Sequence, residues 1–229
     1  MKRTLSILTA SLAFATTANA NFYIGPKIGA NYNVGEYTEF DTGGTWNVSS
    51  KGGAGAAFIG GLNFGYDYLM DSQIYVAIDG AVLFNTLKNE VNKSKGPGFN
   101  QSSILKSSLN YAIALQVGYQ MPNKVTPYVS LGGYGGRYNL EIQNNSGTAQ
   151  GGIAANSCTN TKKTIFAFNP GFGVKYPMGD NLLTSIQYDY VAGGNVSKTI
   201  PDTASTPNYW SYSSKIRQHN VTLALLYSF

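Results

Sequence analysis

The stretch VTLALLYSF, from Val221 to Phe229, decides the fold class of this chain. Its larger apolar side chains stand at every second position, namely Val221, Leu223, Leu225, Tyr227 and Phe229. Such alternation is typical of a β-strand whose two faces meet different surroundings. Soluble domains usually end in a few polar residues. An apolar strand with a ring as its last residue therefore suggests an outer face that meets something other than water.

Seven further runs alternate in the same way, so that the chain is predicted to contain eight strands. These runs are 22–32, 56–68, 74–84, 109–119, 127–140, 165–176 and 182–191. Each is close to the roughly 9–11 residues with which a tilted strand crosses a bilayer. In the fifth run the alternation blurs from Gly132 to Gly136, where we expect a β-bulge to shift its phase.

The connections between the runs are alternately short and long. The short ones are 69–72, 121–126 and 177–181, and the long polar ones are 33–55, 85–108, 139–163 and 192–215. Long structureless loops at every second connection are uncommon in soluble domains but typical of membrane barrels. We therefore predict an all-β fold, an eight-stranded antiparallel up-and-down transmembrane β-barrel with short periplasmic turns and four long extracellular loops. Pairing of 22–32 with 221–229 would close it.

The N-terminus has the three parts of a secretory signal peptide. Lys2 and Arg3 precede a short apolar run, and Ala18-Asn19-Ala20 forms an A-x-A site. We expect a signal peptide over residues 1–20, cleavage between Ala20 and Asn21, and a barrel domain over 21–229. An exported chain does not meet nucleic acid, although its formal net charge is +5. The single cysteine, Cys158, excludes an intrachain disulfide.

Charged residues inside the strands share the face that carries the small side chains. They are Lys27, Asp67, Asp79, Lys175 and Asp189. Because an unpaired buried charge is costly, we expect Lys27, Asp79, Gln116 and Asp189 to form a hydrogen-bonded network in the lumen, with Asn110 nearby. Two interpretations remain open: a polar plug that closes a narrow barrel, and an ion-conducting or gating lumen.

The runs NFYIGPKIGANY (21–32) and TPYVSLGGYGG (126–136), with the terminal YSF, resemble the small bacterial outer-membrane β-barrels of the OmpA, OmpX and opacity-protein type. The resemblance implies a Gram-negative outer membrane and folding by the barrel-assembly machinery. Val221, Leu223, Leu225, Tyr227 and Phe229 would then form the outer-membrane assembly signal, with Phe229 in the periplasmic aromatic girdle. Full-length OmpA-type proteins carry a further peptidoglycan-binding domain, and we expect none here.

No catalytic residue, cofactor or metal site is predicted. The only histidine, His219, lacks the partners of the lipid A-modifying barrels and is expected at the lipid interface. Cys158 has no second cysteine and no nearby histidine with which to bind a metal.

The second to fourth predicted loops are rich in lysine and arginine, which suits the phosphate groups of lipopolysaccharide, although ordinary solvated charge explains them equally well. The first loop differs, with Glu36, Glu39 and Asp41 against Lys51. We therefore expect an integral outer-membrane protein with a structural, adhesive or antigenic role, whose loops meet a host or surface ligand. The alternative is a narrow porin-like channel for ions or small solutes.

Overall fold

The computed structural model describes residues 20–43, 47–96, 99–201 and 209–229. The expected signal peptide lies outside them except for Ala20, with which the first strand begins. The strands in the described residues are β1 (Ala20–Asp41), β2 (Asn47–Leu69), β3 (Ile74–Asn85), β4 (Lys88–Gly96), β5 (Phe99–Tyr119), β6 (Thr126–Asn144), β7 (Ser157–Pro177), β8 (Leu182–Pro201) and β9 (Tyr209–Ser228). No helix among these residues is long and apolar enough to cross a membrane.

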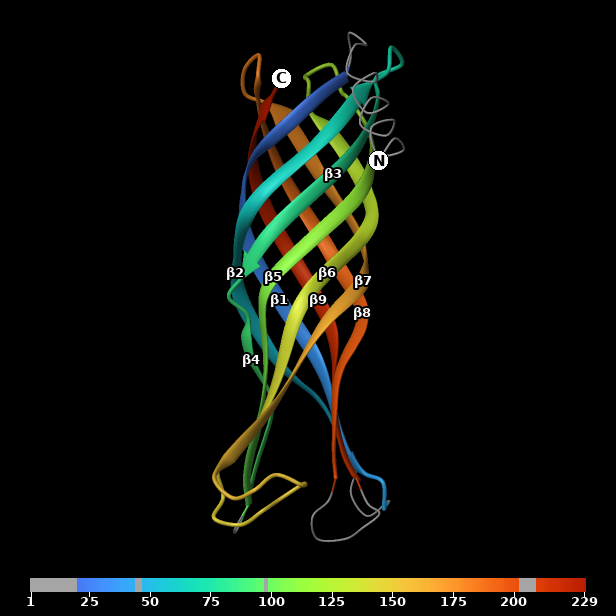
Figure 1. Cartoon of the computed structure of the whole chain (residues 1–229). Coiled ribbons are helices and arrows are strands. Elements are labelled where there is room, and N and C mark those ends of the chain that lie inside the picture. The colour runs from blue at the N-terminus through green and yellow to red at the C-terminus, as the bar shows by residue number, and fades with distance from the viewer. Residues whose placement is uncertain (1–19, 44–46, 97–98, 202–208) are drawn as a thin grey trace, which may run out of the picture.

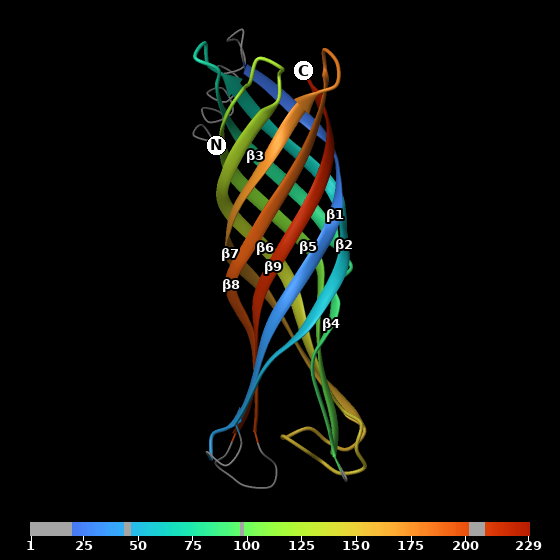
Figure 2. The same cartoon turned by 180° about the vertical axis from the view of Figure 1, so that it is seen from behind.

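The strands form one closed antiparallel ring (Figures 1 and 2). β3 and β4 both pair with β5, because β4 continues the path of β3 after a break at Thr86–Leu87. All other sequence neighbours pair with each other, so the ring is that of an eight-stranded up-and-down barrel. The first and last strands close it in the expected way. Ile28 lies opposite Leu223, and the Phe229 amide donates to the Phe22 carbonyl oxygen at 2.9 Å.

The half of the barrel next to the short turns carries an apolar belt on its outer face. Rings and aliphatic side chains project outward from every strand that reaches it, including Phe58, Phe84, Ile113, Phe166, Phe172 and Leu223. The same strands turn mainly small or polar residues inward, with a few larger ones such as Ile59, Leu83 and Leu226. This arrangement is inside out for a soluble barrel and matches a wall surrounded by lipid.

Beyond the belt the barrel becomes a sandwich of two four-stranded sheets. Pairing of β7 with β8 ends at Phe168 and Ala192, and pairing of β2 with β3 ends at Ile59 and Asn85. One sheet is therefore β2-β1-β9-β8 and the other is β4-β5-β6-β7, and Figure 1 shows the two diverging toward the hairpin ends. Between them lies an apolar core that includes Tyr37, Leu87, Leu105, Leu140, Ile142, Val196, Tyr212 and Ile216. We call this part the extracellular sandwich, after the side of the membrane on which the sequence predicts the long connections.

The four predicted long loops are therefore mostly strand, which corrects their extent. The stretch 33–55, for example, contains the end of β1 and the beginning of β2. Several of its described outward side chains, such as Glu36 and Thr38, are polar because they meet water, and that polarity gave the stretch the composition of a loop. The predicted short turns lie at the opposite end of the barrel, beside the start of β1 and the end of β9 (Figure 1).

The expected bulge at Gly132–Gly136 is wrong, because β6 pairs with β7 in unbroken register from Thr126 to Asn144. The alternation blurs there for a different reason. On the side of the short turns, the apolar side chains of β6, such as Leu131, point outward to lipid. On the side of the hairpin ends, those such as Leu140 point inward to the sandwich core. The face of the strand that meets apolar surroundings changes, while the backbone keeps its regular alternation. The register irregularities lie in β5 between Ser107 and Asn110, and elsewhere in β1, β4 and β8.

Candidate functional site

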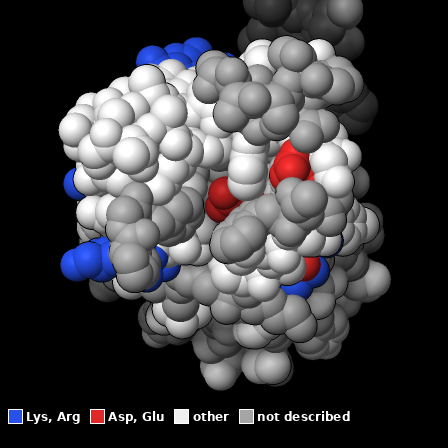
Figure 3. All heavy atoms as spheres, turned by 90° about the horizontal axis from the view of Figure 1, so that it is seen from below, with Lys and Arg blue, Asp and Glu red and all other residues white. Residues whose placement is uncertain are grey.

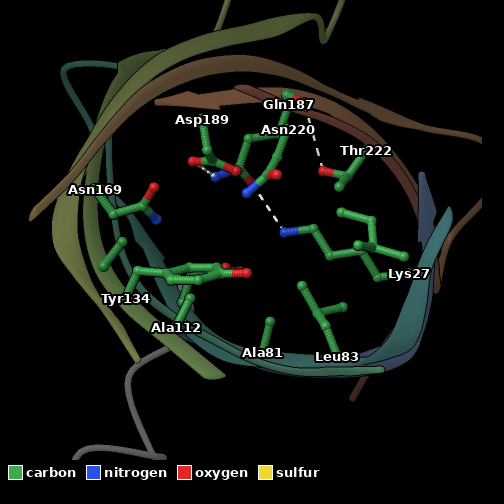
Figure 4. Close-up of a pocket in the computed structure, with 13 residues that line it drawn as sticks. Lys27, Ala81, Leu83, Ala112, Tyr134, Asn169, Gln187, Asp189, Asn220 and Thr222 are labelled. Carbon is green, nitrogen blue, oxygen red and sulfur yellow. Dashed lines mark hydrogen bonds between the residues drawn. The ribbon is translucent and has the colours of Figure 1, made fainter. Parts of the chain in front are cut away.

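The lumen of the membrane half is the candidate site, because it gathers charged side chains from several strands. Lys27 of β1, Asp79 of β3 and Asp189 of β8 are buried and line one small cavity. Figure 4 shows Lys27 and Asp189 reaching into this space from different walls. Gln116 of β5 is also buried, but it lies one inward position nearer the short turns, opposite Ala77.

Gln187 connects two of the predicted network residues. Lys27 donates from Nζ to Gln187 Oε1 at 3.2 Å, and Gln187 donates from Nε2 to Asp189 Oδ1 at 2.7 Å (Figure 4). Tyr128 also donates from its hydroxyl to Gln187 Oε1 at 3.2 Å. Ion pairs between described residues are found only outside the lumen. The amide of Gln187 thus links an ammonium and a carboxylate that do not touch.

Neutral donors satisfy Asp79. The Tyr23 hydroxyl donates to Asp79 Oδ2 at 2.8 Å, and Asn63 donates from Nδ2 to the same oxygen at 2.7 Å. These bonds offset part of the cost of burying the carboxylate. Asn110 is not part of this cluster, since its Oδ1 accepts a bond from Ser107 instead.

Lys175 occupies a cage of tyrosine rings that the predicted network did not include. Its Nζ lies 4.1 Å from the ring centre of Tyr23, 4.9 Å from that of Tyr75 and 5.7 Å from that of Tyr128. It also donates to the Tyr75 hydroxyl, which in turn donates to Gln116 Oε1 at 3.3 Å. Cation–π contacts stabilise an ammonium that has left water. Inner-phase tyrosines at one height were the sequence signal for this cage.

Side chains close the lumen. The cavity beside Lys27 and Asp189 has a volume of about 20 Å³ for the centres of water molecules, which is room for about one or two waters. The tyrosine cage lies on the side of the short turns, and the apolar core of the extracellular sandwich lies on the other side. Among the described residues, side chains therefore fill much of the lumen.

The residues of the expected assembly signal all lie on the outer face of β9 or directly after it. Val221, Leu223, Leu225, Tyr227 and Phe229 are between 44% and 69% exposed. The Phe229 ring packs against Tyr227 and Phe22, with centroids 4.9 and 5.9 Å away. The inward Leu226 between them is buried with Tyr23 and Ala224, so it fills the lumen.

His219 and Cys158 lie outside the lumen. The Nδ1 of His219 is 2.7 Å from the Tyr188 hydroxyl, and its ring packs against Tyr188 and Tyr190 on the outer face. Cys158 is exposed near the start of β7. Within the described residues, no group of three or more histidine, cysteine, aspartate or glutamate side chains is arranged to hold a metal ion.

Two carboxyl groups of the extracellular sandwich have shifted pKa values. Burial raises the pKa of Glu39 to about 7, against a smaller lowering by the hydrogen bond from Tyr37. The hydrogen bond from Lys106 lowers the pKa of Glu141 below its usual range. Glu36, in the predicted acidic first loop, pairs with Arg217 at 3.6 Å.

Comparisons with known proteins agree with this architecture. Residues 4–229 match the family model described as "Outer membrane protein beta-barrel domain". The outer membrane protein PagN of Salmonella typhimurium strain LT2 is 25% identical over 205 residues, which cover 83% of each chain. The crystal structure of OprG from Pseudomonas aeruginosa aligns with a TM-score of 0.53 and 14% identity, covering 92% of this chain and 96% of OprG. Ail, the attachment invasion locus protein of Yersinia pestis, aligns with a TM-score of 0.39 and 11% identity, covering 90% and 98%. The chain belongs to the outer-membrane β-barrel domain family and is a protein of the Gram-negative outer membrane.

Proposed function

We propose that this protein acts in surface interaction: a closed barrel holds a rigid extracellular sandwich whose hairpin ends contact a host or surface ligand. The length of the strands carries the proposal. They continue past the apolar belt as two sheets with an apolar core of their own. A role as adhesin or antigen benefits from such a support, because binding segments are most effective when a rigid scaffold presents them.

The tip of the β6–β7 hairpin, residues 145–156, supports this proposal because it has a defined shape. Asn144 donates from Nδ2 to three carbonyl oxygens of the tip at 2.9–3.1 Å. Ile153 is buried in the sandwich core, and Tyr212 of the opposite sheet donates to the Gly151 carbonyl oxygen at 2.7 Å. The tip therefore bridges the two sheets, and it already has the fixed form that recognition requires.

An attachment assay tests the proposal. The wild type is displayed on a non-adherent Gram-negative strain beside a variant in which a short Asn-Gly turn replaces residues 145–156. We expect the wild type to confer attachment to host cells or an immobilised matrix, and the variant to lose most of it. Both should migrate faster before boiling than after it, which shows that the barrel is folded. Equal attachment by the empty strain and the wild-type strain would refute the proposal.

The channel alternative has less support, because tyrosines, Lys175 and an apolar core fill the path that a solute would follow. Recording from pure protein in planar bilayers distinguishes the two functions. We expect no stable stepwise conductance, and its appearance would favour the channel.

Two partners follow from the same proposal. The alternating apolar residues that end on Phe229 fit recognition by the barrel-assembly machinery, so depletion of that machinery should leave the chain unfolded. The basic outer surface fits contact with lipopolysaccharide. Figure 3, seen from the hairpin end, shows most of the visible lysine and arginine side chains at the margin of the molecule.

A further inference from the structure

A hollow in the outer wall collects cations from four neighbouring strands. It lies where β3 gives way to β4 and where β5 carries its bulge, and it has a volume of about 460 Å³. Its basic lining residues are Lys88, Lys106, Arg137 and Lys162, with hydroxyl groups from Thr86, Ser107 and Ser108 and no acidic residue. Leu87 and Tyr138, both buried in the sandwich core, form its floor. We call this hollow the basic pocket.

Strand register brings these cations together. Lys88 lies opposite Lys106, Lys106 opposite Asn139, and Asn139 opposite Lys162, so one row crosses from β4 to β7. The bulge of β5 is essential here. Residues 110–116 turn their even-numbered side chains inward, whereas beyond the bulge the odd-numbered ones are buried and Lys106 faces outward.

The charges of the basic pocket are poorly balanced. Like charges directly opposite each other destabilise a sheet. Of the four cations, only Lys106 belongs to an ion pair between described residues, with Glu141. A bound anion would relieve the remaining repulsion, and Arg137 offers a planar fork suited to phosphate oxygens.

The height of the basic pocket matches the polar layer of the outer leaflet. Lys88 follows Phe84 by four positions, and Lys162 precedes Phe166 by four on the antiparallel β7. The two rings are 68% and 74% exposed and mark the outer part of the apolar belt. Four residues span about 13 Å along a strand, or about 10 Å along the membrane normal at the usual tilt. Long basic side chains at that height reach lipid phosphates.

We propose that the basic pocket binds a phosphate group of an outer-leaflet glycolipid, that is, of lipopolysaccharide, whose acyl chains lie on the apolar belt below. This site deepens the proposed contact with lipopolysaccharide by giving it a position and four residues. A soluble polyanion would not need cations directly above exposed aromatic rings. The basic pocket lies on the barrel wall, apart from the hairpin ends. The experiment on lipid binding can therefore fail while the one on attachment succeeds, and the reverse.

The test uses full-length mature protein refolded in detergent micelles and titrated with fluorescent lipopolysaccharide. The pocket variant is Arg137→Gln with Lys162→Gln, and the control variant is Lys95→Gln with Lys198→Gln, which removes the same charge elsewhere. We expect the affinity of the pocket variant to fall by about tenfold or more, because charge-assisted hydrogen bonds are lost. The control should stay within about threefold of wild type. Unheated gel mobility verifies that each variant is folded.

Two further ligands identify the source of the phosphate. Dephosphorylated lipopolysaccharide should bind as weakly to wild type as intact lipopolysaccharide does to the pocket variant. Inorganic phosphate should compete only at concentrations far above those of the lipid. An equal loss of affinity in the pocket variant and the control variant would mean that only net charge matters, and it would overturn the site. Equally strong binding of free phosphate would overturn the lipid assignment. In either case attachment by the hairpin ends remains a separate measurement.

Discussion

Glu39 should make the stability of the extracellular sandwich depend on pH. Glu39 is only 3% exposed, and the Tyr37 hydroxyl donates to its Oε2 at 3.2 Å. Ser103 donates to that hydroxyl in turn, at 2.9 Å. Among the residues whose side chains the structure describes, no cation offsets this burial, and the burial raises the pKa of Glu39 to about 7 from its ordinary value of 4.5.

The sign and size of the effect follow from this pKa. The folded protein holds the proton more tightly than the unfolded chain, so the stabilisation is complete below about pH 4.5 and is lost as pH rises through about 7. The difference is about 2.5 pKa units. At about 1.4 kcal/mol per unit, the free energy of unfolding should fall by about 3 kcal/mol between about pH 4.5 and pH 8.

Trp210 packs against the sandwich core and can report its unfolding. In a Trp46→Phe background it is the only tryptophan. Urea unfolding in micelles is followed by its fluorescence for this protein and for the same protein carrying Glu39→Gln, which is neutral at every pH. The difference between the two curves isolates Glu39 from all other titrating groups. A change of about 3 kcal/mol moves the urea midpoint by about 1–3 M.

Parallel pH profiles of the two proteins would refute this reasoning. Such profiles would mean that the Glu39 carboxyl group contacts water or a cation in solution, and that the core near Tyr37 does not exclude them.

Three further substitutions test the packing. Lys27→Met should lower the free energy of unfolding in urea by about 1.5–3 kcal/mol, because it removes a hydrogen bond to a charged group; adding Asp189→Asn should recover part of the loss, and an unchanged midpoint for Lys27→Met would contradict the network. Ile216→Ala should cost about 2–5 kcal/mol through the cavity that it leaves, and a loss below about 1 kcal/mol would mean a loose core. Gly65→Ala should reduce the heat-modifiable folded fraction on gels, because the new methyl group would lie 2.3 Å from the Tyr23 hydroxyl; a wild-type fraction would argue against that contact.

The sequence predicted the membrane half of this fold well. Lipid on one side and a narrow lumen on the other produce strict alternation, as in 221–229 and 109–119, and both stretches are strand apart from the final Phe229. The length of the strands was missed. In 138–142 the alternation continues with Tyr138, Leu140 and Ile142 inward and water outside, which is the pattern of a soluble sheet. Where a strand passes from membrane to water, its apolar side chains change from the outward to the inward positions. The sequence shows this change, but a β-bulge would produce the same pattern.

The sequence predicted which charged residues face the lumen, but it did not predict their hydrogen-bonding partners. Period-2 phase placed Lys27, Asp79 and Asp189 inside, because phase depends only on local alternation. Their partners depend on register between strands that are distant in sequence. Gln187 and Asn63 could therefore not be identified as their hydrogen-bonding residues. The basic pocket was hidden for a similar reason, because a bulge at Ser107–Asn110 turns Lys106 outward.

The central claim, a dry extracellular sandwich above a plugged lumen, is tested most directly by thiol labelling on intact cells. In a Cys158→Ser background, Ile216→Cys and Lys215→Cys place one thiol each at neighbouring positions of β9, the first in the core and the second outside it. A membrane-impermeant maleimide should label Lys215→Cys rapidly and Ile216→Cys only after denaturation. Labelling of both at the same rate would reveal a water-filled interior and contradict the account.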